Sequence, residues 1–258
     1  MLIFIIILVI LFISYVNKTE QFVNYKAITV SPNKTIYDGI VLNIPANNIF
    51  YYKLGEKMKS IYPIKYINYD ETLSIIKNIE MNRNYIGVVP EVMKIIKPDN
   101  FKNTRFISSI GLERFTLFSP SYNNITDWEQ TNNKKIGVIT NSAAFHTLTY
   151  IKTMFSLSFK IISIKLFDES IIKDFKKRRF HAFFMIIAHP NNVLSKIHKD
   201  QPLNFIGTKG MGENAINIAF PNLLKAKIDL THYNIYNSQP DTLLVKLKAC
   251  LNFLNSYF

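Results

Sequence analysis

Residues 39–96 read GIVLNIPANNIFYYKLGEKMKSIYPIKYINYDETLSIIKNIEMNRNYIGVVPEVMKII, and this stretch decides the fold. Three short apolar runs, at 39–44, 64–67 and 85–89, are expected to be strands. The segments between and after them carry apolar residues at helical spacing. Strands that alternate with helices in this way form a mostly parallel sheet with helices on both faces. The sequence therefore predicts an α/β fold.

Local signals place the helices within this stretch. The first helix is indicated by four apolar residues at helical spacing, Phe50, Leu54, Met58 and Ile61. Asp70 is expected to cap the start of the second helix. Pro90 closes the third strand and is expected to begin a third helix, which runs through Ile96. The predicted order is strand, helix, strand, helix, strand, helix.

A second series of the same kind follows the polar stretch 119–133. Its strands are expected at 135–139, 161–166 and 182–187, and its helices at 142–155, 168–177 and 191–197. Two strand-like segments, 104–110 and 114–118, lead out of the first series, and two more follow at 203–206 and 242–250. Two α/β units joined by extended segments predict a two-lobed clamshell, with a ligand cleft at the carboxyl ends of the strands.

The order of these segments suggests how the chain divides between the lobes. Residues 37–118 and 200–258 are expected to form lobe 1, and residues 119–199 lobe 2. A chain of 258 residues with 48% hydrophobic content can bury two such cores without a metal or a disulfide. The single cysteine, Cys250, lies in an apolar segment and is expected to be buried and inert.

The amino-terminal residues 1–17 are expected to form a transmembrane anchor or a signal, and residues 18–36 a polar linker. Residues 2–16 carry no charge and no small-residue cleavage site follows them, so an uncleaved single-pass anchor is favoured over a signal peptide. The lysines that follow would hold the globular part in the cytoplasm. A receptor role would place it outside the cytoplasm or in a lumen, and the sequence leaves the orientation open.

The chain is basic, with a formal net charge of +13. Most of this charge comes from scattered lysines, and residues 173–179 form the single basic cluster. The cluster falls where a helix is expected to end, where cations complement the helix dipole. Attraction to anionic lipid headgroups is the alternative role. Aromatic residues are not interleaved with the basic ones, so nucleic-acid binding is not expected.

Several short motifs carry a resemblance to a known family. Residues 180–191, FHAFFMIIAHPN, resemble a stretch of the TAXI-type solute receptors of TRAP transporters. The segments YYKLG at 51–55, YIGVV at 85–89 and NSAA at 141–144 resemble other segments of that family, in the same order. The resemblance covers residue 39 to the carboxyl terminus. It implies the type 2 periplasmic-binding-protein fold and a small organic solute held between two lobes.

The resemblance also implies where a ligand would lie. Its candidate binding residues fall on the loops before the helices or at the helix starts: Asn47, Asn48, Tyr51, Asp70, Glu91, Ser142 and Ala143. Three of these loops lack the glycines that the family uses to bring backbone amides close to an anionic ligand group. Acidic residues at 70 and 71 would oppose a carboxylate there. A scaffold that has lost its ligand and serves a structural or interaction role is therefore the alternative.

Enzymatic activity is not expected from these residues. None of the five histidines has the spacing of a metal site, and no motif of a catalytic nucleophile surrounds Ser142, which is expected to cap the helix that follows it. We expect no catalytic residues, no metal and no cofactor. The transporter partner that a TAXI receptor would need is left open by the sequence.

Overall fold

The structure is a computed structural model that describes residues 40–46, 49–61, 64–82, 85–236 and 239–252. The expected anchor at 1–17 and linker at 18–36 lie outside these residues. In the part of the chain that the structure describes, no helix is both long enough and apolar enough to cross a membrane.

The first series forms three parallel strands with helices after each. Its elements are β1 (Ile40–Pro45), α2 (Ile49–Ile61), β2 (Ile64–Asp70), α3 (Thr72–Met81), β3 (Tyr85–Pro90) and α4 (Val92–Ile96). Strand β1 is central and pairs in parallel with both β2 and β3. Gly87 of β3 faces Ile79 of α3 so closely that a Cβ atom there would clash. This contact explains a glycine inside a strand, because the helix can pack directly on the backbone.

The second series repeats this arrangement. Its elements are β5 (Lys135–Ile139), α5 (Ala143–Met154), β6 (Lys160–Ile164), α6 (Ile171–Lys176), β7 (Ala182–Ile187) and α7 (Asn192–Asp200). Strand β5 pairs in parallel with β6 and β7. The alternation read from the sequence, and the α/β fold class that it predicts, are thus confirmed.

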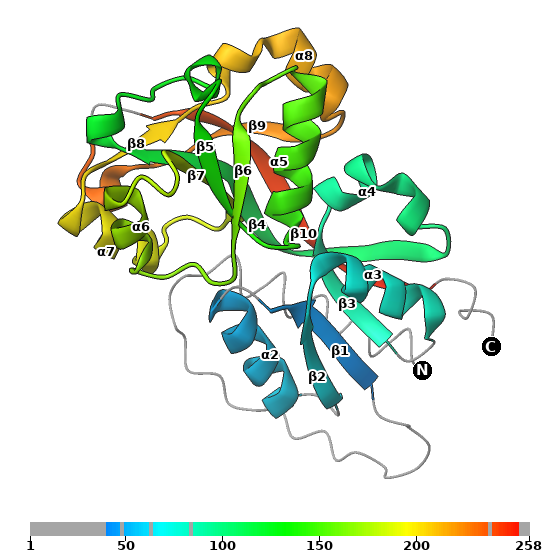
Figure 1. The fold of residues 1–258 in the computed structure, drawn as a ribbon. Coiled ribbons are helices and arrows are strands. Elements are labelled where there is room, and N and C mark those ends of the chain that lie inside the picture. Colours follow the sequence, from blue (N-terminus) through cyan, green and yellow to red (C-terminus); the bar gives the residue numbers. More distant parts are fainter. Residues whose placement is uncertain (1–39, 47–48, 62–63, 83–84, 237–238, 253–258) are drawn as a thin grey trace, which may run out of the picture.

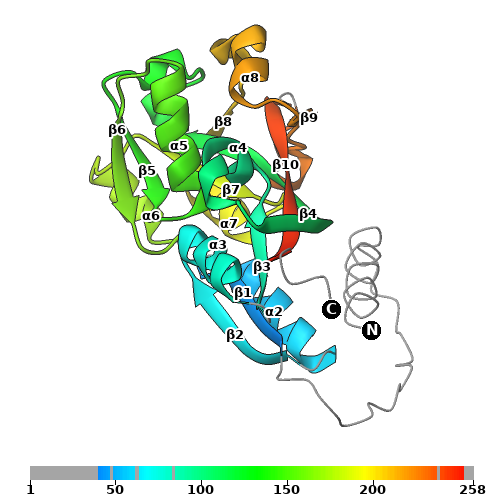
Figure 2. The same ribbon diagram turned by 90° about the vertical axis from the view of Figure 1, so that its right-hand side faces the viewer.

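Two long antiparallel strands connect the two series. Strand β4 spans Thr104–Pro120 and strand β10 spans Asp241–Asn252. Strand β10 pairs with β3 of the first series, and β4 pairs with β7 of the second, so the sheet runs in the order β2-β1-β3-β10-β4-β7-β5-β6. Figures 1 and 2 show the two bodies on either side of these strands. The sheet is therefore continuous between the two series, and β4 and β10 are the described strands that connect them.

Strand β4 differs from the expectation of two separate strands at 104–110 and 114–118. Its partner β10 pairs across the expected break, with Leu247 opposite Gly111 and Lys246 opposite Leu112. The register shifts between Leu247 and Lys248, which accommodates an irregularity without ending the strand. A polar interruption in the sequence is tolerated here because the ladder satisfies the backbone.

Elements between residues 203 and 236 contact the second series, whereas residues 200–258 are expected to belong to lobe 1. This segment contains β8 (Leu203–Ile206), α8 (Glu213–Ala219) and β9 (Leu224–Lys227). Strand β8 pairs with the end of β4 that lies beside β7. Side chains of Phe205 and Tyr233 belong to the same buried cluster as Phe118 and Phe183. The lobe boundaries remain a proposal, and these contacts favour a larger second lobe.

The start of helix α3 corrects one expectation. Asp70 was expected to be its cap, but Asp70 is the last residue of β2 and pairs with Pro45 of β1. Helix α3 begins at Thr72, and Glu71 stands at the cap position without a side-chain hydrogen bond to the helix. The sheet ladder extends three residues beyond the apolar run 64–67, so Asp70 belongs to the strand.

Candidate functional site

A small cavity lies at the carboxyl ends of the strands, between the two series. Its described lining is Pro45, Tyr51, Asp70, Thr72 and Pro90 from the first series, and Ile139, Ser142, Ala143, Ala144, Met185 and Ile186 from the second. The volume of the cavity is about 50 Å³, which is room for about one or two water molecules. Both series contribute to it, as expected for a cleft at the strand ends of two α/β units.

Tyr51 connects this cavity to a buried carboxyl group. Tyr51 is on α2, and its hydroxyl donates a hydrogen bond of 2.5 Å to Oε1 of Glu113 on β4. Glu113 is buried, and its Oε2 has no hydrogen-bond partner. Burial raises the pKa of Glu113 to about 8, although the bond from Tyr51 opposes the shift. The group is therefore predominantly protonated and uncharged at neutral pH.

Ser142 and the residues around it form the beginning of helix α5. The Ser142 hydroxyl accepts a hydrogen bond from the backbone N–H of Phe145 at 3.1 Å and donates one to the carbonyl of Ile139 at 2.8 Å. The predicted capping role of Ser142 is confirmed. Ala143 and Ala144 follow it, and both are buried against the cavity. Their methyl groups occupy space that glycines would leave open.

A hydrogen bond joins the two series beside the cavity. Asn141 has a left-handed backbone, with φ of 53°, and its side-chain Nδ2 donates to Oε1 of Glu71 at 2.7 Å. Glu71 precedes α3 and Asn141 precedes α5, so the bond spans the gap between the lobes. Close by, helix α4 packs against α5, and Met93 and Leu148 belong to one buried cluster. These contacts join the two series beside the cavity.

The structure gathers four of the seven residues predicted to bind a ligand. Tyr51, Asp70, Ser142 and Ala143 line the cavity, and Asn47 and Asn48 lie outside the described residues. Glu91 does not line the cavity. Its backbone N–H and its side-chain Oε1 both bond to the backbone of Lys246 on β10, at 2.8 Å each. Glu91 thus ties α4 to a connecting strand.

The sequence did not identify several residues of this site, and Glu113 is the most informative of them. It is a single carboxylate in the middle of the apolar segment 104–120, and an acid in such a place is unusual unless it is partnered. This isolated acid in an apolar segment could have identified Glu113 from the sequence. The lining residues Ile139, Met185 and Ile186 could have been found from the rule that ligands bind at the carboxyl ends of strands.

His189, from the motif that resembles TAXI receptors, takes part in a separate buried network. Its Nε2 lies 2.7 Å from the hydroxyl of Thr116, and its Nδ1 lies 2.9 Å from the hydroxyl of Tyr233. The same Tyr233 hydroxyl accepts the backbone N–H of Asn191. Burial, together with the nearby charge of Arg114, lowers the pKa of His189 to about 3. A neutral histidine with both nitrogens engaged is a structural group here.

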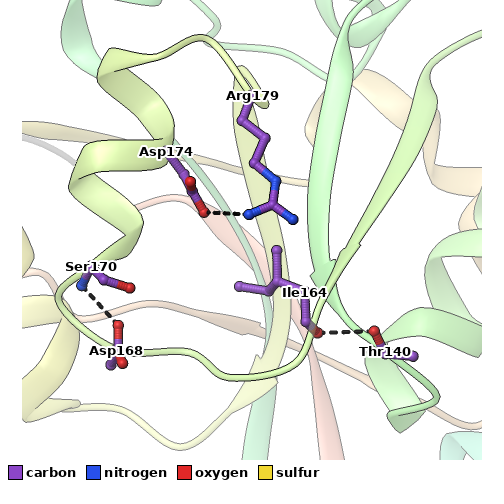
Figure 3. Close-up of polar contacts among 6 residues, drawn as sticks. All are labelled: Thr140, Ile164, Asp168, Ser170, Asp174 and Arg179. Atoms are coloured by element: carbon purple, nitrogen blue, oxygen red, sulfur yellow. Dashed lines mark hydrogen bonds and ion pairs between the residues drawn. The ribbon is translucent and has the colours of Figure 1, made fainter.

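Figure 3 shows the polar contacts around the end of β6, the loop that follows it and helix α6. Thr140 donates from its hydroxyl to the carbonyl of Ile164 at 3.0 Å, and Asp168 accepts the backbone N–H of Ser170 at 2.8 Å. At the other end of α6, Arg179 pairs with Asp174 at 3.1 Å. The basic residues 176–179 are exposed, in agreement with a solvated cluster.

Metal binding receives no support from the described part of the chain, where no group of three or more His, Cys, Asp or Glu side chains is placed to hold an ion. Cys250 is buried, and it donates from Sγ to the carbonyl of Gly87 at 3.3 Å. Burial raises the pKa of this thiol well above its usual range. The expectation of a buried cysteine is confirmed.

Comparison with known proteins identifies the fold. No family model matches the sequence, and no curated protein matches it. Among solved structures, the arginine-, lysine- and histidine-binding protein ArtJ from the thermophilic bacterium Geobacillus stearothermophilus aligns with a TM-score of 0.50 and 10% identity, over 84% of each chain.

Two further structures align with a TM-score of 0.49. The GluR0 ligand-binding core in complex with L-glutamate has 11% identity, over 83% of this chain and 84% of its own. A substrate-binding protein of an uptake transporter from Streptococcus pneumoniae with bound histidine has 8% identity, over 84% and 81%. Identities this low show the fold alone. The chain has the two-lobed α/β fold of the periplasmic binding proteins.

Proposed function

We propose that this protein is a non-enzymatic receptor that holds a small organic solute between its two lobes. The observation that carries the proposal is the cavity lined by both series at the carboxyl ends of their strands. A solute bound there contacts both lobes, so its binding energy favours the closed arrangement over an open one. The name of ArtJ gives amino acids as its ligands, and we propose a solute of comparable size here.

We further propose that the protein is a TAXI-type receptor of a TRAP transporter. In this assignment residues 1–17 tether the protein to a membrane, and the globular part lies outside the cytoplasm or in a lumen. Its support is the ordered set of motifs in the sequence. The segment 189–191 contributes a half-buried histidine. It also contributes a helix cap, because the side chain of Asn191 accepts the backbone N–H of Leu194 at 3.0 Å. A transporter partner belongs to this finer proposal.

The small volume of the cavity reflects how closely the two series approach each other. The Asn141–Glu71 bond and the contact of α4 with α5 bring the walls together. Drug-sized ligands occupy pockets of about 300 to 1,000 Å³, so the lobes have to separate to admit a solute and then close on it. Since few contacts other than β4 and β10 join the lobes, a hinge at these strands can supply that motion.

Thermal unfolding of the full chain against a library of small organic solutes tests the proposal. A solute present at about 100 times its dissociation constant adds about 2.7 kcal/mol of stability, which raises the melting temperature by roughly 5 to 10 °C. Ala144→Phe fills the cavity and is expected to abolish the rise. Ala215→Phe, at an exposed position of α8, is the matched control and should preserve it.

A second candidate function is an interaction or structural protein that has kept the clamshell and lost its ligand. The observation that favours it is the combination of alanines at 143 and 144 with a volume of only about 50 Å³. The same experiment distinguishes the two candidates, because a scaffold shows no saturable rise with any solute, whether or not the cavity is filled.

A further inference from the structure

The charge that lines the cavity is opposite in sign to the net charge of the chain. The chain carries a net charge of +13, yet Asp70 is the single charged side chain in the described lining of the cavity. Asp70 is half-buried, and its Oδ1 accepts the backbone N–H of Glu71 at 2.7 Å. A carboxylate accepts several hydrogen bonds, so its other oxygen remains available as an acceptor.

The hydroxyl groups of the cavity direct their hydrogens away from a ligand. Tyr51 donates its hydrogen to Glu113, and Ser142 donates its hydrogen to the carbonyl of Ile139. Neither hydroxyl therefore has a hydrogen left to donate to a ligand. The third hydroxyl, on Thr72, can serve either role. A ligand that donates hydrogen bonds fits this set better than one that accepts them.

Negative charge also faces the place where a ligand carboxylate would be expected to bind. The first turn of α5 is the positive end of that helix, where anions are favoured. Glu71 already stands there, because its carboxylate bonds to Asn141 immediately before the helix. A second carboxylate would lie close to both Glu71 and Asp70, and like charges in a partly desolvated cleft repel each other.

We propose that the cavity binds a small organic cation, a protonated primary amine on a short apolar body, and rejects the carboxylate that has the same body. This inference rests on the proposed function, because it assigns a ligand class to the same cavity. Asp70 pairs with the ammonium group. The apolar walls from Ile139, Met185 and Ile186 pack against the hydrocarbon part.

The test uses three compounds of one shape: isobutylamine, isobutanol and isobutyrate. Each is titrated into the full chain while the carbon-13-labelled methyl groups of Ala143, Ala144 and Met185 are followed by nuclear magnetic resonance. Isobutylamine is expected to shift these methyl signals saturably, at least about tenfold more tightly than isobutyrate, since one opposed charge contact costs roughly that factor or more. Isobutanol is expected to lie between them.

Two matched variants assign the preference to one carboxylate. Asp70→Asn is expected to weaken isobutylamine binding by about tenfold and to remove the preference over isobutyrate. Asp168→Asn is the control, because Asp168 also accepts a local backbone N–H after a strand but does not line the cavity. Should Asp70→Asn unfold, Asp70→Glu keeps the charge and is expected to retain the preference for the amine.

The outcomes separate this inference from the proposed function. Saturable binding of isobutyrate or isobutanol at least as tight as that of isobutylamine overturns the cation assignment and leaves solute binding in the cavity intact. Absence of any shift with all three compounds overturns the cation assignment, and the library screen with Ala144→Phe then decides the proposed function by itself. An equal loss of amine binding in Asp168→Asn also contradicts the role given to Asp70.

Discussion

Two buried polar clusters lie on opposite faces of strand β4, three residues apart, and they differ in how fully their groups are bonded. On one face, Glu113 accepts a bond from Tyr51 and leaves Oε2 without a partner. On the other face, His189 has Thr116 at one ring nitrogen and Tyr233 at the other. Residues 113 and 116 fall on opposite faces because side chains alternate along a strand.

The difference separates a structural group from a candidate functional one. In the histidine cluster both ring nitrogens have hydrogen-bond partners. The cluster therefore stabilises the second lobe and leaves no ring nitrogen to bond a ligand. The glutamate cluster is incomplete, and Tyr51 links it to the cavity. Buried groups with unmet hydrogen-bonding capacity and displaced pKa values gather at functional sites. This contrast therefore points to the cavity, although the motif that resembles a known family contains the histidine.

The largest expected effect is the dependence of stability on pH. The pKa of Glu113 is raised from 4.5 to about 8, so the folded chain keeps a proton that the unfolded chain loses above pH 4.5. Stability should therefore fall as the pH rises from about 4.5 to 8, by about 3 to 5 kcal/mol. Glu113→Gln is expected to flatten this alkaline limb, measured by urea unfolding across the range.

The pKa of His189 predicts a pH dependence of stability with the opposite sign, which the same urea-unfolding experiment measures. Its pKa is lowered from 6.5 to about 3, so the unfolded chain takes up a proton below pH 6.5 that the folded chain refuses. Stability should fall as the pH drops through this window, and lowered pKa values of His146, His181 and His198 add to the acid limb. An alkaline limb that persists unchanged in Glu113→Gln contradicts the assignment of that limb to the carboxyl group.

The next largest effect is the loss of unfolding free energy when the hydroxyl group is removed from either of two tyrosines. Tyr233→Phe leaves a buried histidine nitrogen and the backbone N–H of Asn191 without partners, and is expected to cost about 2 to 4 kcal/mol. Tyr51→Phe removes one bond from a carboxyl group that is already incompletely bonded, and is expected to cost about 1 kcal/mol. Urea unfolding at pH 6 measures both. Equal costs would show that the two clusters do not differ as described.

The smallest effect concerns the bond between the lobes. Glu71→Ala removes the bond to Asn141 and no helix cap, because the Glu71 side chain makes no capping bond. We expect a loss of about 0.5 to 1 kcal/mol. Glu169→Ala is the control, since it removes the exposed ion pair with Lys196 inside the second series, which is worth about 0 to 1 kcal/mol. Only Glu71→Ala should increase the separation of the lobes.

The sequence predicted what depends on local pattern. The parallel strands of both series and the cap at Ser142 follow from apolar periodicity and from one hydroxyl at a helix start. The expected end of β2 was wrong because Asp70 pairs with Pro45, a contact that no local signal reports. Likewise, two segments expected to be separate strands form the single strand β4, because β10 pairs across the expected break.

The candidate site was predictable only in part, because some of its residues are brought together by long-range contacts that no local signal reports. Tyr51 near the start of α2 and Ser142 at the cap of α5 both lie just after strand ends, where a general rule places ligands. The pairing of Tyr51 with Glu113 joins residues 62 positions apart, and the packing of elements between residues 203 and 236 on the second lobe depends on contacts such as Phe205 with Phe118. Such long-range contacts are set by the completed fold and leave no periodic trace in the sequence.

The most direct test of the central claim, that a solute is held between the lobes, is the distance between them with and without that solute. Spin labels at introduced cysteines replacing Lys57 on α2 and Lys176 on α6, both exposed, report this distance by double electron–electron resonance, while buried Cys250 resists labelling. The account predicts that a solute which raises the melting temperature shortens and narrows the distance distribution in the wild type but not in Ala144→Phe. An unchanged distribution in the presence of a saturating solute would contradict binding between the lobes.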